Sequence, residues 1–181
     1  SPSPTGSFQH GPWLGRDDDL DDKLQEDEFS LALGLGFVDE SGAKMRRTVL
    51  DNLPVDRLAT VIHPQALIAP SANLGAGAFL AAGSIIGTNS TVGPGTLINT
   101  GAIVDHDCQI AANVHVATGA RITGSVSVGE NSLVGAGAVL RQGIRVGKNC
   151  LIGAGAVVLS DIADGSMVFG NPAKSKGRPN G

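Results

Sequence analysis

Two histidines, His106 and His115, interrupt a stretch of small and aliphatic residues, NTGAIVDHDCQIAANVHVATGA, at positions 99–120. Asp107 follows His106 directly, and a carboxylate in that place would hold the imidazole and raise its basicity. An imidazole that titrates near neutrality is a suitable general base for an amine or hydroxyl nucleophile. The pair predicts acid–base catalysis. A turn role for Asp107 and an interface-packing role for His115 are the open alternatives.

The elements that must position these residues follow from a six-residue repeat. Every sixth residue from Ile62 to Val158 is aliphatic, and the series first fails at Asp164. Three positions after each aliphatic residue, from Ser71 to Asp161, stands only Gly, Asn, Asp or Ser. These residue types accept left-handed backbone angles or form turns. Each hexad is therefore expected to be a short strand with a sharp corner, and three hexads should close one coil of a parallel β-helix.

The residues that point outward between the corners fall on three faces, two of them apolar and one polar. The first face carries Phe79, Leu97, His115, Leu133 and Leu151, the second carries Ile85, Ile103, Arg121, Val139 and Val157, and the third carries Asn73, Thr91, Gln109, Ser127 and Arg145. Large exposed apolar patches usually mark an interface, and two such faces would close a ring of three copies. We expect a homotrimer; the alternative is that the N-terminal segment covers one apolar face.

The repeat places the two histidines apart within one chain. His106 lies at the corner between the second apolar face and the polar face, whereas His115 lies on the first apolar face. The corner of one copy could meet the first face of its neighbour, so we expect an active site between subunits. Zinc needs three or four converging ligands, and His63 lies more than two coils away. No metal is therefore expected.

Composition narrows the class of protein. The net charge of −4 and the pI near 5.4 argue against a nucleic-acid partner or an anionic membrane surface. No apolar run approaches the roughly 20 residues of a membrane span, and no signal peptide is evident. The two cysteines, Cys108 and Cys150, give no disulfide framework. We expect a cytoplasmic protein.

Four segments carry a family resemblance: INTGAIVDHDCQI, VHVATGA, ATVIHPQALIAPSA and VFGNPAK. Together they resemble one branch of the hexapeptide acetyltransferases, which contains sialic acid O-acetyltransferase and the sugar-nucleotide N-acetyltransferases, including the enzyme that acts on the bacillosamine precursor. The resemblance covers about residues 55–175. It implies that the all-β solenoid is a left-handed parallel β-helix and that acetyl-CoA is the cosubstrate.

The same resemblance implies roles for individual residues. His106 would be the general base, Asp107 would raise its basicity, and His115 would contact the thioester region of acetyl-CoA. Asn99 would position the substrate. Backbone contacts to CoA would fall at Gly124, Ala136 and Ala154.

Residues 1–58 match the family less closely. Family members begin with a small Rossmann-like domain, and this chain resembles only its second half, with a strand over Phe29–Gly36 and a helix over Ala43–Leu53. No glycine fingerprint follows a first strand. We divide the chain into a partial Rossmann-like α/β segment with a mobile start (1–58), the β-helix domain (59–174) and a tail (175–181).

The expected activity is direct transfer of acetyl from acetyl-CoA to an amine or hydroxyl of a sugar. The resemblance alone favours a nucleotide-linked amino sugar. Two alternatives remain open, because fold does not decide function. The chain could be a non-catalytic trimeric scaffold or degenerate paralogue, or an acyltransferase with a non-sugar acceptor.

Overall fold

A computed structural model describes residues 30–176. The predicted mobile start and residues 177–181 of the predicted tail lie outside these described residues. The chain divides into two units, Ser1–Ser30 and Leu31–Gly181, and everything below concerns the second. Between residues 30 and 176 no helix is long and apolar enough to cross a bilayer.

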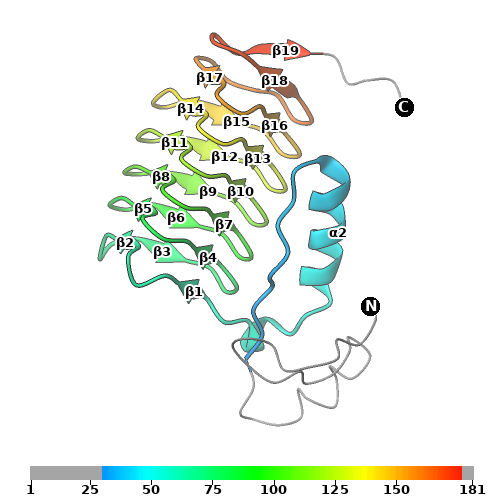
Figure 1. The fold of residues 1–181 in the computed structure, drawn as a ribbon, viewed down its shortest axis with the longest axis vertical. Coiled ribbons are helices and arrows are strands. Elements are labelled where there is room, and N and C mark those ends of the chain that lie inside the picture. The colour runs from blue at the N-terminus through cyan, green and yellow to red at the C-terminus, as the bar shows by residue number, and fades with distance from the viewer. Residues whose placement is uncertain (1–29, 177–181) are drawn as a thin grey trace. The chain divides into compact units, whose positions relative to one another are not determined.

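Short parallel strands form three sheets that wind around one core (Figure 1). The eight-stranded sheet contains β1 (Val61–Ile62), β4 (Phe79–Leu80), β7 (Leu97–Ile98), β10 (His115–Val116), β13 (Leu133–Val134), β16 (Leu151–Ile152), β18 (Met167–Phe169) and β19 (Lys174–Lys176). The six-stranded sheet contains β2 (Leu67–Ile68), β5 (Ile85–Ile86), β8 (Ile103–Val104), β11 (Arg121–Ile122), β14 (Val139–Leu140) and β17 (Val157–Val158). The five-stranded sheet contains β3 (Asn73–Leu74), β6 (Thr91–Val92), β9 (Gln109–Ile110), β12 (Ser127–Val128) and β15 (Arg145–Val146).

The register between coils is 18 residues, as the repeat predicts. His115 of β10 lies between Leu97 of β7 and Leu133 of β13, 18 residues away on either side. The inward aliphatic residues, every sixth from Leu80 to Val158, are at most 3% exposed. This confirms the predicted all-β solenoid, a parallel β-helix of hexapeptide repeats. Strand β19 pairs antiparallel with β18 and extends to Lys176, two residues past the expected end of this domain at 174.

The corners also follow the predicted pattern. Fourteen consecutive corner positions, six residues apart, have a φ between 53° and 76°: Gly77, Gly83, Asn89, Gly95, Gly101, Asp107, Asn113, Gly119, Ser125, Asn131, Gly137, Gly143, Asn149 and Gly155. Ser71 and Asp161, at the two ends of the predicted series, are not among the positive-φ residues. Left-handed corners thus run without interruption from Gly77 to Gly155.

One helix and an extended segment precede the coils. Helix α2 (Glu40–Asp51) begins at Asp39, whose side chain accepts a hydrogen bond from the Gly42 N–H at 2.7 Å. It starts three residues before the expected Ala43. A single turn of 3₁₀ helix, η2 (Val55–Arg57), leads to the first coil.

The predicted strand over Phe29–Gly36 is wrong for the described residues 30–36. The chain there is extended but makes only an isolated bridge, Leu31 to Leu58. Its backbone bonds go to the residues that lead into the first coil, with Leu31 N–H donating to Arg57 O at 2.8 Å. A strand needs a neighbouring strand over several residues, and none lies beside it among the described residues. We call residues 31–37 the strap.

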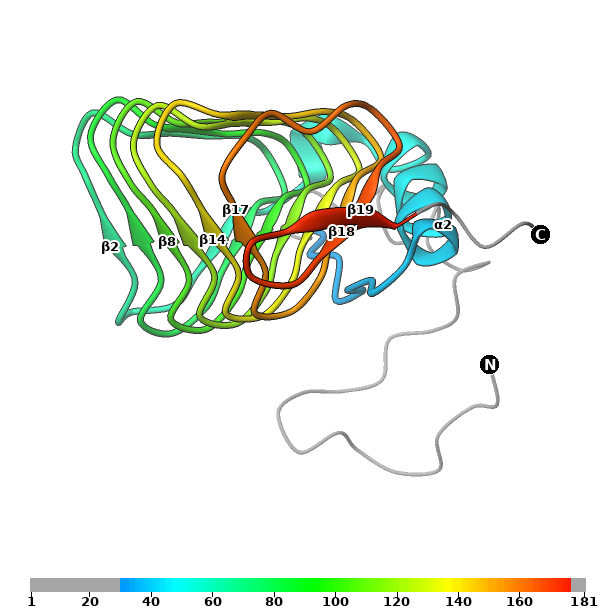
Figure 2. The ribbon, with the colours of Figure 1, turned by 90° about the horizontal axis from the view of Figure 1, so that it is seen from above.

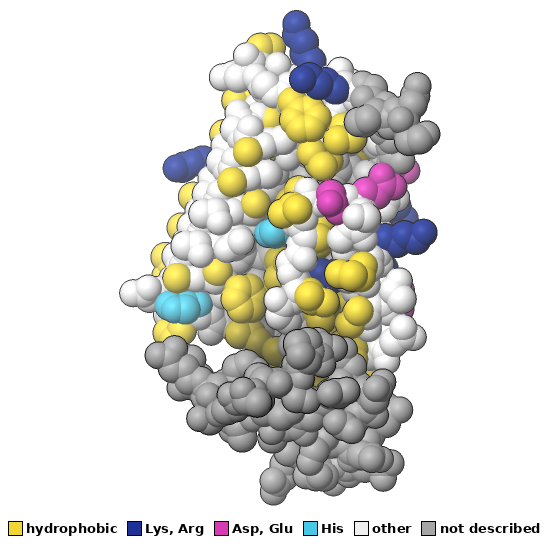
Figure 3. Space-filling view, turned by 45° about the vertical axis from the view of Figure 1, so that its right-hand side comes forward, with side chains coloured by type: hydrophobic (Ala, Val, Ile, Leu, Met, Phe, Trp, Pro, Cys, Tyr) yellow, Lys and Arg dark blue, Asp and Glu magenta, His cyan; other side chains and the backbone are white. Residues whose placement is uncertain are grey.

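The strap and α2 pack on the eight-stranded sheet (Figures 1 and 2). On this face Leu97 and His115 are 8% exposed and Leu133 is 9% exposed. Figure 3 brings this side forward and shows apolar side chains gathered along it. We call it the covered face, the outer side of the six-stranded sheet the open apolar face, and that of the five-stranded sheet the polar face. The expectation of two bare apolar faces is corrected: the N-terminal segment covers the first.

Candidate functional site

The corner between β8 and β9 brings His106 and Asp107 together. The left-handed backbone of Asp107, with φ of 57°, turns its side chain back so that Oδ2 lies 2.8 Å from Nδ1 of His106. The residue is therefore both a turn residue and the partner of the imidazole. With the ring proton on Nδ1 facing the carboxylate, Nε2 carries the lone pair that can accept a proton.

Two further residues support this pair and were missed from the sequence. Asn89, one coil earlier, donates from Nδ2 to the second carboxylate oxygen of Asp107 at 3.3 Å. The side chain of Asp105 accepts a hydrogen bond from the backbone N–H of His106 at 2.8 Å. The signal for Asn89 was present, since residues 18 apart stack directly on one another.

Hydrogen bonding sets the protonation of the pair. The hydrogen bond that His106 donates to Asp107 raises the pKa of His106 above its ordinary value, and the charges of Asp105 and Asp107 act in the same direction. The hydrogen bonds from His106 and Asn89 lower the pKa of Asp107. Both side chains are about half exposed, 44% for His106 and 52% for Asp107. The geometry gives a carboxylate-held imidazole that a ligand can reach.

Gly124 lies directly against the ring of His106, on the next coil. A Cβ at this position would collide with Nε2 and Cε1 of the imidazole. The absence of a side chain therefore lets the imidazole lie over the backbone of Gly124. Two predicted functional residues, one catalytic and one for CoA contact, are thus adjacent.

His115 occupies a different environment. It lies under the strap, where Nδ1 is 2.7 Å from the carbonyl oxygen of Phe37 and the two rings meet edge-on at 5.4 Å. Burial lowers the pKa of His115 and the positive charge of Arg46 acts in the same direction, while the hydrogen bond to Phe37 O opposes them. Burial and Arg46 thus favour the neutral ring, and its proton must lie on Nδ1 because a carbonyl oxygen can only accept. Sequence reasoning gave no sign of Phe37 or Arg46 as its neighbours.

Asn99 and His115 share a small pocket between the strap and the coils. Its volume is about 190 Å³, and its other lining residues are Leu33, Gly34, Leu35, Gly36, Phe79 and Leu97. The side-chain oxygen of Asn99 accepts a hydrogen bond from the Thr100 N–H at 2.7 Å. The amide nitrogen of Asn99 therefore remains as the donor.

Ala136 and Ala154 lie apart from both groups. They are exposed at the corner between the covered face and the open apolar face, and Gly155 N–H donates to Ala136 O at 2.8 Å. One chain therefore holds the predicted residues as three groups: His106, Asp107 and Gly124 at one corner, Asn99 and His115 in the pocket, and the two alanines at a third place.

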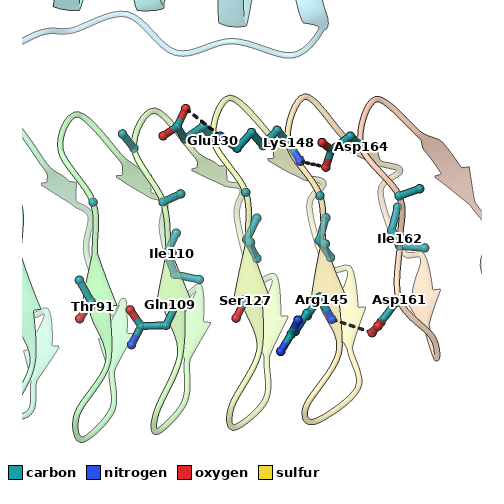
Figure 4. A pocket seen from close by; sticks show the side chains of 18 of the residues that line it. Thr91, Gln109, Ile110, Ser127, Glu130, Arg145, Lys148, Asp161, Ile162 and Asp164 are labelled. Atoms are coloured by element: carbon teal, nitrogen blue, oxygen red, sulfur yellow. Dashed lines mark hydrogen bonds and ion pairs between the residues drawn. The ribbon is translucent and has the colours of Figure 1, made fainter.

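A larger hollow of about 960 Å³ lies along the polar face and contains none of the predicted residues (Figure 4). Among its charged side chains, those of Glu130, Lys148, Asp161 and Asp164 contact one another or the backbone. Lys148 Nζ lies 3.9 Å from Glu130 Oε2, and Asp161 accepts from the Arg145 N–H at 2.8 Å. Across the described part of the chain, no group of three or more His, Cys, Asp or Glu side chains is arranged to hold a metal ion.

Comparison with known proteins gives a family match and several similar structures. Residues 125–160 match the model of the bacterial transferase hexapeptide (six repeats) family. No curated protein sequence matched.

Three solved structures illustrate the similarity. A GDP-perosamine N-acetyltransferase from Caulobacter crescentus, with one histidine replaced by alanine and in complex with CoA and GDP-perosamine, is 35% identical with a TM-score of 0.84, covering 96% of this chain and 81% of that one. The acetyltransferase domain of PglB from Neisseria gonorrhoeae FA1090, in complex with acetyl coenzyme A, is 33% identical with a TM-score of 0.83, covering 97% and 84%. WeeI from Acinetobacter baumannii AYE, at 24% identity and a TM-score of 0.76 over 94% and 81%, shares the fold.

Proposed function

Since the chain belongs to the hexapeptide-repeat sugar acetyltransferases, we propose that it transfers an acetyl group from acetyl-CoA to an amine or hydroxyl of a sugar. A nucleotide-linked amino sugar is the preferred acceptor. Supporting this choice, one similar structure holds CoA with GDP-perosamine and another holds acetyl coenzyme A.

The observation that carries the proposal is the His106–Asp107 pair at 2.8 Å. In the reaction, the acceptor nitrogen or oxygen attacks the thioester carbonyl carbon while Nε2 of His106 takes its proton. The C–S bond then breaks and CoA leaves with the sulfur electrons. Asp107 stabilises the imidazolium that forms, and no covalent acyl-enzyme is required.

The developing oxyanion needs a hydrogen-bond donor. His115 is not suited to this role, because its Nδ1 proton is already given to Phe37 O and its other nitrogen is an acceptor. Gly124 lies against the base, and its backbone N–H has no acceptor among the described residues. We assign the oxyanion to Gly124.

The site we propose is shared between copies in a homotrimer, in the cytoplasm. His106 stands at a corner beside the open apolar face, whereas Asn99 and His115 lie in the pocket on the covered face. The open apolar face, which presents Ile85, Ile103 and Val139, would pack on a neighbour. Copies arranged in a ring would bring the corner of one to the pocket side of the next.

The test is CoA release from acetyl-CoA with a panel of GDP- and UDP-linked amino sugars and free sugars, with the acetylated product identified by mass spectrometry. Replacement His106→Ala is expected to lower kcat by roughly 10²–10⁴-fold, the usual contribution of a general base. The matched control is His63→Ala, which removes another exposed histidine of the β-helix. Turnover that survives in His106→Ala, or no turnover with any acceptor, would contradict the proposal.

A further inference from the structure

Arg46 of α2 is completely buried and joins three separate parts of the fold. Its Nε donates to Leu35 O of the strap at 2.6 Å, and its Nη1 donates to Gly95 O and to Asn113 Oδ1, each at 2.5 Å. Burial lowers the pKa of this guanidinium to about 10. Its Nη2 has no partner among the described residues. Burying an arginine in this way is costly, so a specific role is expected.

Two of the acceptors of Arg46, Leu35 and Asn113, lie close in sequence to the two residues of the contact that holds His115. Leu35 stands two residues before Phe37, and Asn113 stands two residues before His115. Phe37 O and His115 Nδ1 are the two ends of the 2.7 Å hydrogen bond under the strap. We propose that Arg46 is a positioning residue for His115, which holds the strap and β10 together so that the imidazole stays neutral and presents Nε2 as an acceptor.

Asn113 carries this connection further. While its Oδ1 accepts from Arg46, its Nδ2 donates to Ala43 O of α2 at 3.0 Å and to Asn131 Oδ1 at 2.9 Å. Asn113 also has the left-handed φ of a corner residue, 53°. Asn113 therefore ties a backbone turn of the coil to the helix, and Arg46 ties that helix to the strap. Each hydrogen bond of this kind stabilises the fold modestly, and a buried partner left without its bond costs more than the bond contributes.

The surroundings of His115 match the neutral state. On the coils its strand neighbours are Leu97 and Leu133, and the strap residues 33–37 carry no charge. Arg46 is the charged group that acts on the ring, and it opposes protonation. The pocket that His115 lines thus offers an acceptor from His115 and a donor from Asn99. Such a pair suits a ligand group with one donor and one acceptor, such as a hydroxyl or a secondary amide.

The experiment is ¹⁵N–¹H NMR of the histidine rings as a function of pH, in protein labelled at histidine. In the wild type we expect the His115 ring to be neutral at pH 7 with its proton on Nδ1. In Arg46→Met we expect a mixture of tautomers, because the strap no longer holds Phe37 O against Nδ1. We also expect a higher pKa, because burial, the largest influence on this ring, is reduced and the nearby cation is lost, which outweighs the loss of the Phe37 hydrogen bond. Arg47→Met is the matched control, since it removes a more exposed cation of the same helix, whose hydrogen bonds go to Asp51.

A wild-type ring protonated on Nε2, or an Arg46→Met spectrum identical to wild type, would overturn the proposal. If Arg46→Met does not fold by circular dichroism, Arg46→Lys replaces it: the charge stays but the planar fork is lost, so the pKa should remain low while the tautomer is no longer fixed. A ring that stays fixed in that variant also contradicts the proposal.

Only the catalytic part of this inference rests on the proposed function. In Arg46→Met, kcat/KM for acetyl-CoA should fall roughly tenfold, the value of one or two hydrogen bonds, while the pH profile governed by His106 stays in place. An inactive wild type would refute the proposed function and leave the NMR result to decide the role of Arg46.

Discussion

Asp107 serves both the backbone and the chemistry of its corner. The equivalent position is Gly143 two coils later, and that glycine makes the same left-handed turn without a side chain. A carboxylate is therefore not needed to close the corner. Its presence at Asp107, bonded to both His106 and Asn89, is better explained by the basicity that it gives the imidazole.

Replacement Asp107→Asn tests this explanation while keeping a residue that tolerates left-handed angles. The loss of the carboxylate lowers the pKa of His106 back toward its ordinary value. A base acts only when unprotonated, so the acidic limb of kcat/KM against pH should move to lower pH. The plateau rate should fall because the base is weaker.

The control for Asp107→Asn is Asp51→Asn, which neutralises an exposed carboxylate on α2. Its profile should match the wild type. An unmoved acidic limb in Asp107→Asn would show that the carboxylate does not tune the base.

Gly124→Ala should damage activity more than stability. The new Cβ meets the imidazole of His106, which is a partly exposed side chain that can swing away from Asp107. We expect kcat to fall at least tenfold. The free energy of unfolding should change by less than about 1 kcal/mol, because moving a partly exposed side chain costs little.

Gly129→Ala provides the contrast for Gly124→Ala. Its Cβ would lie 2.6 Å from backbone atoms of Gly147 and Lys148, which cannot move aside. That variant should lose about 1–3 kcal/mol of stability and keep its activity per folded molecule. Urea unfolding and steady-state rates of both variants test this contrast. A Gly124→Ala variant that loses stability but keeps its activity would refute this interpretation of Gly124.

At the scale of elements, the coils could be predicted because their rules are local and repeated. The aliphatic residue and the small or turn-forming residue of each hexad set the strand and the corner, and the 18-residue stacking follows. The position of His106 at one corner and His115 on another sheet came from the same counting, as did Gly124 on the coil after His106. The structure agrees at each of these points.

The strap and helix could not be predicted in this way. Phe37 contacts His115 across 78 residues, and Arg46 contacts Asn113 across 67, and neither pairing follows a period. The strand predicted over Phe29–Gly36 came with the resemblance of this segment to the second half of a Rossmann-like domain. Of the strap, Phe37 is buried on the covered face without strand pairing, whereas Leu35 is 39% exposed.

The left-handed corners predict how the free energy of unfolding changes when a corner glycine is replaced. Gly119 has a φ of 67°, and a Cβ added to it would meet no atom within 4 Å, so substitution there costs backbone strain alone. Gly119→Ala should lower the free energy of unfolding by about 1–2 kcal/mol. Gly119→Asn should cost clearly less, since asparagine fills the same position at Asn89, Asn113, Asn131 and Asn149. Equal losses in urea titrations would contradict the strain argument.

At the scale of the whole molecule, the open apolar face is the surface left to explain. Leu67 is 64% exposed at its lower end, and half-buried Ile85, Ile103 and Val139 continue it. Val139→Glu should dissociate the proposed trimer and abolish activity while circular dichroism stays unchanged, because the coil core is not touched.

Ser127→Glu on the polar face adds the same charge away from that surface and should leave both the trimer and the activity intact. Sedimentation equilibrium gives the mass of each variant. A monomeric wild type, or an active Val139→Glu monomer, would exclude a site shared between copies.

The 18-residue register has a consequence for how such a chain can change in length. Adding or removing 18 residues shifts every later residue by one coil along the axis of the β-helix. Each side chain stays on the same face. A coil inserted after Leu140 would leave His106 and Gly124 as neighbours. A coil inserted between His106 and Gly124 would separate them while every corner kept its conformation. Residue number therefore gives the position along the axis of the β-helix. The proposed chemistry depends on His106 and Gly124 staying on adjacent coils.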